Sequence, residues 1–339
     1  MAQGAMGDPG RRVRIVDIKV TPIAFRDPPL RNAAGVHEPY ALRSIIEITA
    51  SNGQTGLGEG YGDAASLMAL EAVAPRLIGL EITDLNGLRN SIGETLAGLP
   101  PPPPGQELAP GSDPARQGAS CLSAIEVPLL DLQAKTAGLP LHALLGGAVR
   151  REVPFSAYLF FKFDRHIDTP DRPDSWGEAA TPDQIVAQAR RMITRHGFRG
   201  IKLKGGTLPP TIEVASIEAL AEAFPGYPLR IDPNGAWSME TAISVAARLG
   251  HLIECYEDPV DGLDAMAELH RQTGLPLATN MVVTCFDHVR QSVAKHAVQI
   301  VLSDHHYWVA WGQASISPRS AQPSGLAFPC IRTCTWASA

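Results

Sequence analysis

Alternation of hydrophobic and polar residues is the first feature of the chain. Residues 13–25 and 43–50 alternate in the way that a strand with one buried face does. After the second of these runs comes Asn52-Gly53, and Asn-Gly between alternating segments is typical of a β-hairpin. Apolar residues recur with helical spacing in residues 66–98 and 119–135. This part of the chain is therefore predicted to be an α+β domain.

From about Val153 the pattern changes to short apolar runs that alternate with amphipathic helices. One of these helices is bounded by Thr181 as N-cap and Gly197 as C-cap. Strands that alternate with helices predict βαβ units and a parallel sheet. Six strands can be counted, whereas a closed (β/α)₈ barrel needs eight. The predicted strands lie in residues 153–160, 200–204, 228–235, 252–259, 276–280 and 299–304.

Composition narrows the class of protein. The chain has 339 residues, of which 45% are hydrophobic, so a large core can form. A net charge of −6 argues against a nucleic-acid partner, which requires a basic face. No apolar run reaches the roughly 18 residues of a membrane helix, the N-terminus lacks the apolar segment of a secretory signal, and the 5 cysteines show no disulfide spacing. We expect a cytoplasmic protein with free thiols, without nucleic-acid or membrane partners.

Polar side chains follow most of the predicted strands at the point where each strand ends. In a parallel barrel the chemistry lies at these ends. Asp, Glu and Asn oxygens from three successive strand ends suit a hard divalent ion such as Mg²⁺. A lysine beside a cation and another ammonium has a lowered pKa, so it can serve as a general base. The residues at these ends are Lys202, Lys204, Asp232, Asn234, Glu257, Asp258, Asn280 and Asp304.

Each of these signals has a simpler explanation when taken alone. Lys-x-Lys is most often a solvated strand end, and Asp-Pro-Asn-Gly suits a turn. The order of polar groups along five strand ends favours a site over turn chemistry. Two alternatives stay open: an aldolase that forms a Schiff base on Lys204, which does not need the acidic residues together, and an inactive chain with an incomplete barrel.

The order of these residues resembles the enolase superfamily, and its glucarate dehydratase group in particular. The resemblance covers residues 13–308 and implies a (β/α)₇β barrel of the TIM type with an N-terminal α+β capping domain. It also implies a Mg²⁺-dependent acid-sugar dehydratase that acts on a hexarate, or another diacid-sugar dehydratase or epimerase, and a homo-oligomer. The segments that carry it are NAAGVHEPYALRS (32–44), GLGEGYGD (56–63), AIEVPLLDLQAK (124–135), SAYLFF (156–161), IKLKGG (201–206), IDPNGAW (231–237), YEDP (256–259), LATNMVVT (277–284) and VLSDHHYW (301–308).

The resemblance also implies a role for each candidate residue. Lys204 corresponds to the general base, and Asp304 to the partner that orients a catalytic His at the seventh strand. The implied substrate contacts are His37, Tyr158, Lys202, Asn234 and Asn280, and the implied Mg²⁺ ligands are Asp232, Glu257 and Asn280.

The chain departs from the family after Trp308. No seventh strand is visible and no His follows His306. Loss of one G from a run of G after the Trp308 codon explains this, because restoring it permits Gly-Gly-Leu-Gly at 309–312 and Met-His-Ser-Asn-Met-His-Leu-Gly across 329–337. The family has a similar His-Ser-Asn run at its seventh strand. We therefore predict a capping domain in residues 1–150, a partial barrel in 151–308 and a frame-shifted tail in 309–339, with a divergent but genuine C-terminus as the alternative.

Overall fold

The computed structural model describes residues 12–100, 117–167, 173–304 and 308. A three-stranded antiparallel sheet comprises β1 (Ile15–Arg26), β4 (Tyr40–Ala50) and β5 (Thr55–Tyr61), in the order β1-β4-β5. The predicted hairpin is confirmed, because Ala50 and Gln54 pair across a turn in which Gly53 has a φ of 81°. Glycine adopts this left-handed conformation without steric cost.

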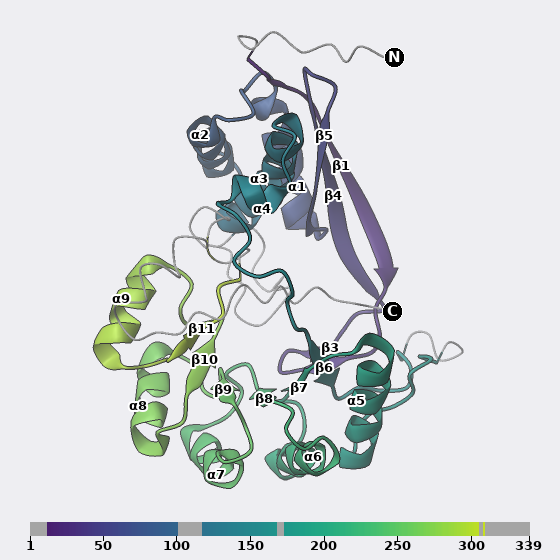
Figure 1. Ribbon diagram of the computed structural model, residues 1–339, viewed down its shortest axis with the longest axis vertical. Coiled ribbons are helices and arrows are strands. Elements are labelled where there is room, and N and C mark those ends of the chain that lie inside the picture. Colours follow the sequence, from purple (N-terminus) through teal and green to yellow (C-terminus); the bar gives the residue numbers. More distant parts are fainter. Residues whose placement is uncertain (1–11, 101–116, 168–172, 305–307, 309–339) are drawn as a thin grey trace.

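Helices cover one face of this sheet (Figure 1). The helical pattern over residues 66–98 is divided between two helices, because Gly79 and Leu80 leave the helix to pair with Ile15 of β1. The helices of this domain are α1 (Ala64–Leu77), α2 (Leu85–Ala97), α3 (Gln117–Thr136) and α4 (Leu141–Leu144).

The glycines of β5 allow α3 to lie directly on the sheet. A Cβ atom at Gly56 would lie 1.9 Å from the carbonyl oxygen of Pro128, and one at Gly58 would lie 2.3 Å from Cδ of the same proline. At Gly60 it would lie 2.9 Å from the Cβ of Ala124. The run Gly56-Leu57-Gly58-Glu59-Gly60 therefore has a packing role: every second residue faces the helix, and none of them can carry a side chain.

The second lobe is a curved sheet of six parallel strands, in the order β11-β10-β9-β8-β7-β6. The six predicted strands are confirmed, and the five helices between them lie on the outer side of the curve (Figure 1). The strands are β6 (Ser156–Phe160), β7 (Gly200–Lys204), β8 (Leu229–Asp232), β9 (Cys255–Glu257), β10 (Leu277–Thr279) and β11 (Ile300–Val301), and the helices are α5 (Pro182–His196), α6 (Pro210–Ala223), α7 (Met239–Leu249), α8 (Leu263–Thr273) and α9 (Phe286–Lys295).

Both predicted caps of α5 are present. The Thr181 hydroxyl accepts a hydrogen bond from the Gln184 N–H, and the Gln184 side chain accepts one from the Thr181 N–H, which is a capping box. Gly197 ends the helix with a φ of 68°.

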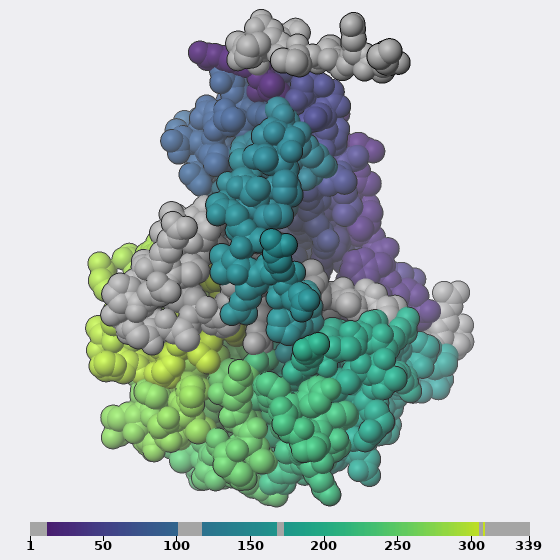
Figure 2. Space-filling view, viewed as in Figure 1, coloured from purple at the N-terminus to yellow at the C-terminus, as the bar shows by residue number. Residues whose placement is uncertain are grey.

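The two lobes have separate hydrophobic cores. The segment that follows α3 runs from the upper lobe to the lower one (teal in Figure 2). A small hairpin of β2 (Arg31–Asn32) and β3 (Gly35–Val36) lies on the barrel, where the Arg31 N–H donates to the Phe161 carbonyl at 2.8 Å. In the part of the chain that the structure describes, no helix combines the length and apolar character needed to cross a membrane.

Candidate active site

Strand register places the predicted site residues side by side. Tyr158 of β6 pairs with Lys202 of β7, and Lys204 pairs with Asp232 of β8. The residues between them, Leu203 and Ile231, are fully buried against the helices. Because side chains alternate along a strand, the polar residues share the opposite face, inside the curve of the sheet.

Two lysines and two carboxylates form a buried ionic cluster on this inner face. The Lys202 ammonium lies 2.6 Å from Glu257 Oε1 and 2.9 Å from Asp232 Oδ2. The Lys204 ammonium lies 2.8 Å from the same Asp232 oxygen. Asp232 and Glu257 are each 2% exposed or less, so their charges are stabilised by the neighbouring ammonium groups instead of by water.

The charges shift the proton affinities of the cluster. Burial has the largest single effect on the pKa of Lys204 and lowers it, but the charges of Asp232 and Tyr158 and the hydrogen bond to Asp232 together raise the pKa above its ordinary value. In this arrangement the opposite charge of Asp232 is in direct contact with the ammonium, and the lowered pKa expected beside a cation stays a prediction. For Asp232, burial raises the pKa, but Lys202 and Lys204 lower it well below the usual range. For Glu257, burial and the charge of Asp232 raise the pKa.

The third predicted metal ligand, Asn280, presents an oxygen without a partner. Its Oδ1 atom is buried and has no hydrogen-bond partner among the described residues. Asn280 follows β10, which lies beside β9, the strand that ends at Glu257. A buried amide oxygen without a partner is costly, which suits a position where a ligand completes its contacts.

These three residues fit a hard divalent cation. Asp232, Glu257 and Asn280 offer only oxygen atoms, the donor set that Mg²⁺ prefers. The described part of the chain contains no site made by three or more His, Cys, Asp or Glu side chains, so an ion here depends on the amide as its third ligand. The Lys202 ammonium bridges the carboxylates of Asp232 and Glu257, and a divalent cation would compete with this ammonium for both of them.

Asn234 lies beside Asp232. Its N–H donates to Asp232 Oδ1 at 3.0 Å, and its side-chain amide lies 3.0 Å from the sulfur of Met281. A φ of 52° at Asn234 is tolerated because the short amide side chain permits a left-handed backbone at such turns.

His37 and Tyr158 are connected to the cluster by a series of ring contacts through Phe160. The Lys202 ammonium lies 4.7 Å from the centre of the Tyr158 ring, and that ring lies 4.6 Å from Phe160. The His37 ring meets Phe160 edge-on at 5.9 Å, while its Nδ1 lies 2.9 Å from Asp27 Oδ2. The structure therefore brings the capping-domain histidine to the side of the barrel that carries the lysines.

Asp304 follows β11, two strands along the sheet from Glu257. Its carbonyl accepts the N–H of Trp308, whose ring is buried against Phe286. The predicted frame-shifted tail lies outside the described residues, and the histidine that Asp304 is predicted to orient belongs to the restored reading frame.

Comparison with known proteins decides the family. The profile described as "Mandelate racemase / muconate lactonizing enzyme, N-terminal domain" matches residues 15–146, and "Enolase C-terminal domain-like" matches residues 184–311. A "Probable glucarate dehydratase" of Streptomyces coelicolor is 48% identical over 305 residues, which are 88% of this chain and 70% of the relative. The chain belongs to the enolase superfamily.

Other enolase-superfamily proteins agree with this assignment. An enolase from Pseudomonas fluorescens Pf0-1, solved with bound magnesium, potassium and tartrate, has a TM-score of 0.91 and 57% identity, over 94% of this chain and 75% of that one. An enolase from Thermobispora bispora, solved with magnesium and formate, has a TM-score of 0.86 and 42% identity, over 93% and 74%. The L-talarate/galactarate dehydratase of Salmonella typhimurium is 27% identical over 316 residues, 87% of this chain and 70% of the relative.

The sequence reasoning missed Glu213, which holds the loop after Lys204. This residue of α6 is completely buried, and its carboxylate accepts the N–H groups of Gly206, Thr207 and Leu208 at 2.9, 2.8 and 2.8 Å. Burial raises its pKa, and these hydrogen bonds only partly offset that effect. An acidic residue in the first turn of a helix was the available signal, but its partners depend on how the loop folds back.

The capping domain also contacts this loop. The Arg31 guanidinium donates to the Thr207 carbonyl at 3.3 Å and lies over the Phe163 ring at 4.9 Å. The loop that follows β7 is therefore held by α6 on one side and by the β2–β3 hairpin on the other.

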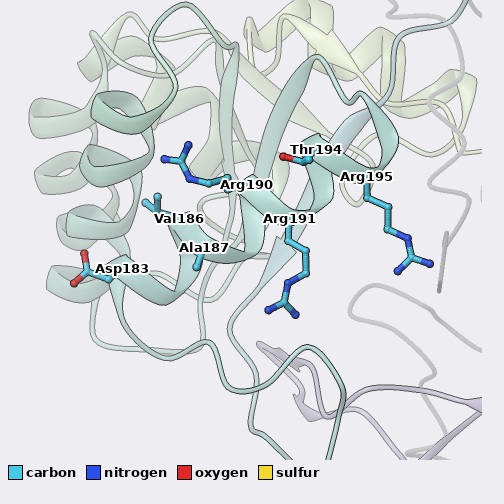
Figure 3. A pocket seen from close by; sticks show the side chains of 7 residues that line it. All are labelled: Asp183, Val186, Ala187, Arg190, Arg191, Thr194 and Arg195. Carbon is cyan, nitrogen blue, oxygen red and sulfur yellow. The ribbon is translucent and has the colours of Figure 1, made fainter.

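A groove elsewhere on the enolase-superfamily barrel has no part in this cluster. It runs along α5, where Arg190, Arg191 and Arg195 line it (Figure 3). The buried residues of that helix, Ile185 and Ala189, do not line it, so the groove lies on the outer surface of the barrel.

Proposed function

We propose that this active site belongs to an acid-sugar dehydratase, most simply a glucarate dehydratase. The observation that carries the proposal is the cluster of Lys202, Lys204, Asp232 and Glu257, with the buried Oδ1 of Asn280 beside it. The relatives support the substrate class. One is named a probable glucarate dehydratase, and another was solved with tartrate, a dicarboxylate with hydroxylated carbons.

The proposed reaction is a β-elimination. The proton α to a carboxylate is removed, its C–H electron pair forms a carbon–carbon double bond, and the hydroxyl on the neighbouring carbon leaves as water once it has gained a proton. Lys204 would accept the α-proton, and Lys202 would bind the substrate carboxylate. When bound by Asp232, Glu257 and Asn280, Mg²⁺ would stabilise the negative charge that develops on that carboxylate.

The ion pair at Lys204 sets a condition on this role. In contact with Asp232 the lysine holds its proton, and it can act as a base only when the Asp232 carboxylate is engaged elsewhere. The aldolase alternative would need the same neutral amine, and it leaves the grouping of Asp232, Glu257 and Asn280 unexplained. His37, Tyr158 and Asn234 would border the substrate.

The proposed elimination also needs a second catalytic group, the acid for the leaving hydroxyl. A histidine oriented by Asp304 would donate the proton to the leaving hydroxyl, and we place it in the reading frame restored after Trp308. The 339-residue chain would then lack this acid.

Turnover of hexarates by the frame-restored protein tests the function. We expect activity with added Mg²⁺ and none in EDTA, and no lysine adduct after borohydride treatment. Equal turnover in EDTA would contradict the metal assignment, and a trapped adduct would favour the aldolase. The genomic DNA read through the G run after the Trp308 codon tests the frame independently.

A further inference from the structure

A second layer of hydrogen bonds surrounds the turn that carries Asn280. The Thr279 hydroxyl donates to Asp258 Oδ1 and accepts the N–H groups of Met281 and Val282, each at 3.0 Å. Asp258 Oδ2 accepts the N–H of Asn280 at 3.1 Å. One carboxylate and one hydroxyl thus hold three successive backbone N–H groups.

The burial and the backbone conformation of Asp258 are both energetically unfavourable. Its side chain is buried within the field of two other carboxylates, and burial together with the charges of Asp232 and Glu257 disfavours its ionised form. Its backbone has a φ of 38°, which residues other than glycine seldom adopt. Backbone strain of this kind persists where the surrounding structure enforces it.

The backbone of Asp258 connects three strands. Its N–H donates to the Ala278 carbonyl of β10 at 2.9 Å, and its carbonyl accepts the N–H of Gly235, after β8, at 2.6 Å. The side chain therefore holds the Asn280 turn relative to the strand ends that carry Asp232 and Glu257.

We propose that Thr279 and Asp258 are positioning residues that fix Asn280 so that its Oδ1 faces the cation site. This inference rests on the metal chemistry of the proposed function. An amide oxygen carries no net charge and binds a cation less strongly than a carboxylate does, so its orientation must be set beforehand. Loss of such supporting hydrogen bonds typically costs about 10–100-fold in metal affinity.

Binding of Mn²⁺ to the 339-residue chain, followed by the electron paramagnetic resonance of the free ion, tests the inference without any substrate. Thr279→Val removes the hydroxyl while it keeps the shape and charge, and it is expected to raise the Kd about 10–100-fold. Thr279→Ser keeps the hydroxyl and is expected to restore most of the affinity. Thr273→Val is the matched control, because the Thr273 hydroxyl donates to the Leu269 carbonyl and accepts the Leu275 N–H, so both of its bonds lie at the C-terminal end of α8.

The outcomes separate this inference from the proposed function. Asp232→Asn provides the reference for a broken site. If the wild-type chain binds Mn²⁺, Asp232→Asn does not, and Thr279→Val binds as tightly as wild type, the positioning role is wrong and the metal site stands. If the wild-type chain binds no Mn²⁺, the positioning role and the metal site of the proposed function are both wrong. Thermal melting in EDTA shows whether Thr279→Val folds. If it does not fold, Asp258→Asn takes its place. The Kd for Mn²⁺ is then expected to rise by the same factor, and an affinity equal to that of wild type would again show that the positioning role is wrong.

Discussion

Lys204 Nζ and Asp232 Oδ2 lie 2.8 Å apart across neighbouring parallel strands, and the same oxygen lies 2.9 Å from Lys202. One carboxylate oxygen thus holds two ammonium groups that strand alternation places on the same face. Without Asp232 the two lysines would repel each other in a buried position, so this residue stabilises the cluster as well as being a predicted metal ligand.

Substitution of each lysine is expected to separate their roles in the frame-restored protein. Lys204→Ala should reduce exchange of the substrate α-proton in D₂O by about 10²–10⁴-fold, because it removes the proposed base. Lys202→Ala should mainly raise KM, since it removes a contact to the carboxylate. Proton NMR of the substrate measures the exchange. Wild-type exchange in Lys204→Ala would remove this residue from the mechanism.

Glu213→Gln is expected to loosen the loop after Lys204. Glutamine offers one oxygen in place of two and directs an N–H₂ group at a backbone N–H, so about 1–3 kcal/mol of unfolding free energy should be lost. Hydrogen exchange at Gly206, Thr207 and Leu208 should accelerate.

Glu218→Gln on the same helix is the control for this loop experiment. Glu218 pairs with Arg248, a side chain that is 57% exposed, and such surface pairs contribute at most about 1 kcal/mol. If both variants lost equal stability and kept the loop amides protected, the clamp formed by Glu213 would be unimportant.

Gly56→Ala tests the contact between β5 and α3. The new methyl group would overlap the Pro128 carbonyl, and overpacking of this kind costs about 1–3 kcal/mol or more. Gly93→Ala is the matched control, because no atom lies within 4 Å of the position of its Cβ and it lies within helix α2. There alanine should be neutral or stabilising by up to about 1 kcal/mol. Urea unfolding compares the two, and equal stability would contradict the close approach of the helix.

The thiol of Cys121 predicts a loss of stability at alkaline pH. Burial raises its pKa from 9.0 to about 12. Above pH 9 the unfolded chain has released this proton while the folded chain retains it, so the unfolding free energy falls as pH rises. The slope should be about 1.4 kcal/mol per pH unit, ending near the folded-state pKa.

Cys121→Ala isolates this effect from the titration of lysines and tyrosines. The variant should lose stability less steeply than wild type between pH 9 and 11, whatever its stability at neutral pH. Identical slopes for the two proteins would show that the thiol is not protected from ionisation in the folded state.

The frame-restored protein is expected to be more stable and more active than the 339-residue chain. Within the described sheet, β6 and β11 each pair with a neighbour on one side only, and further strands would cover these edges. Loss of a general acid costs about 10²–10⁴-fold in rate. Both proteins should be expressed, melted and assayed side by side. Equal cooperative melting and equal dehydratase turnover would show that residues 309–339 are a genuine functional end.

Local chemistry made much of this protein predictable from its sequence. The caps Thr181 and Gly197 act within a single helix, and the strand ends that carry Lys204, Asp232 and Asn280 follow from alternation and from the convergence of parallel strands. Family resemblance added the roles of these residues.

The tertiary structure alone decided which groups touch. Whether one oxygen of Asp232 serves both lysines depends on the register between strands that are 28 residues apart. Glu213 binds a loop that folds back over its own helix, and Asp258 reaches the Asn280 turn 22 residues further along the chain. Such contacts depend on distances between segments that only packing brings together, and the large shifts in proton affinity at Asp232 and Lys204 depend in turn on those distances, because charge interactions strengthen as water is excluded.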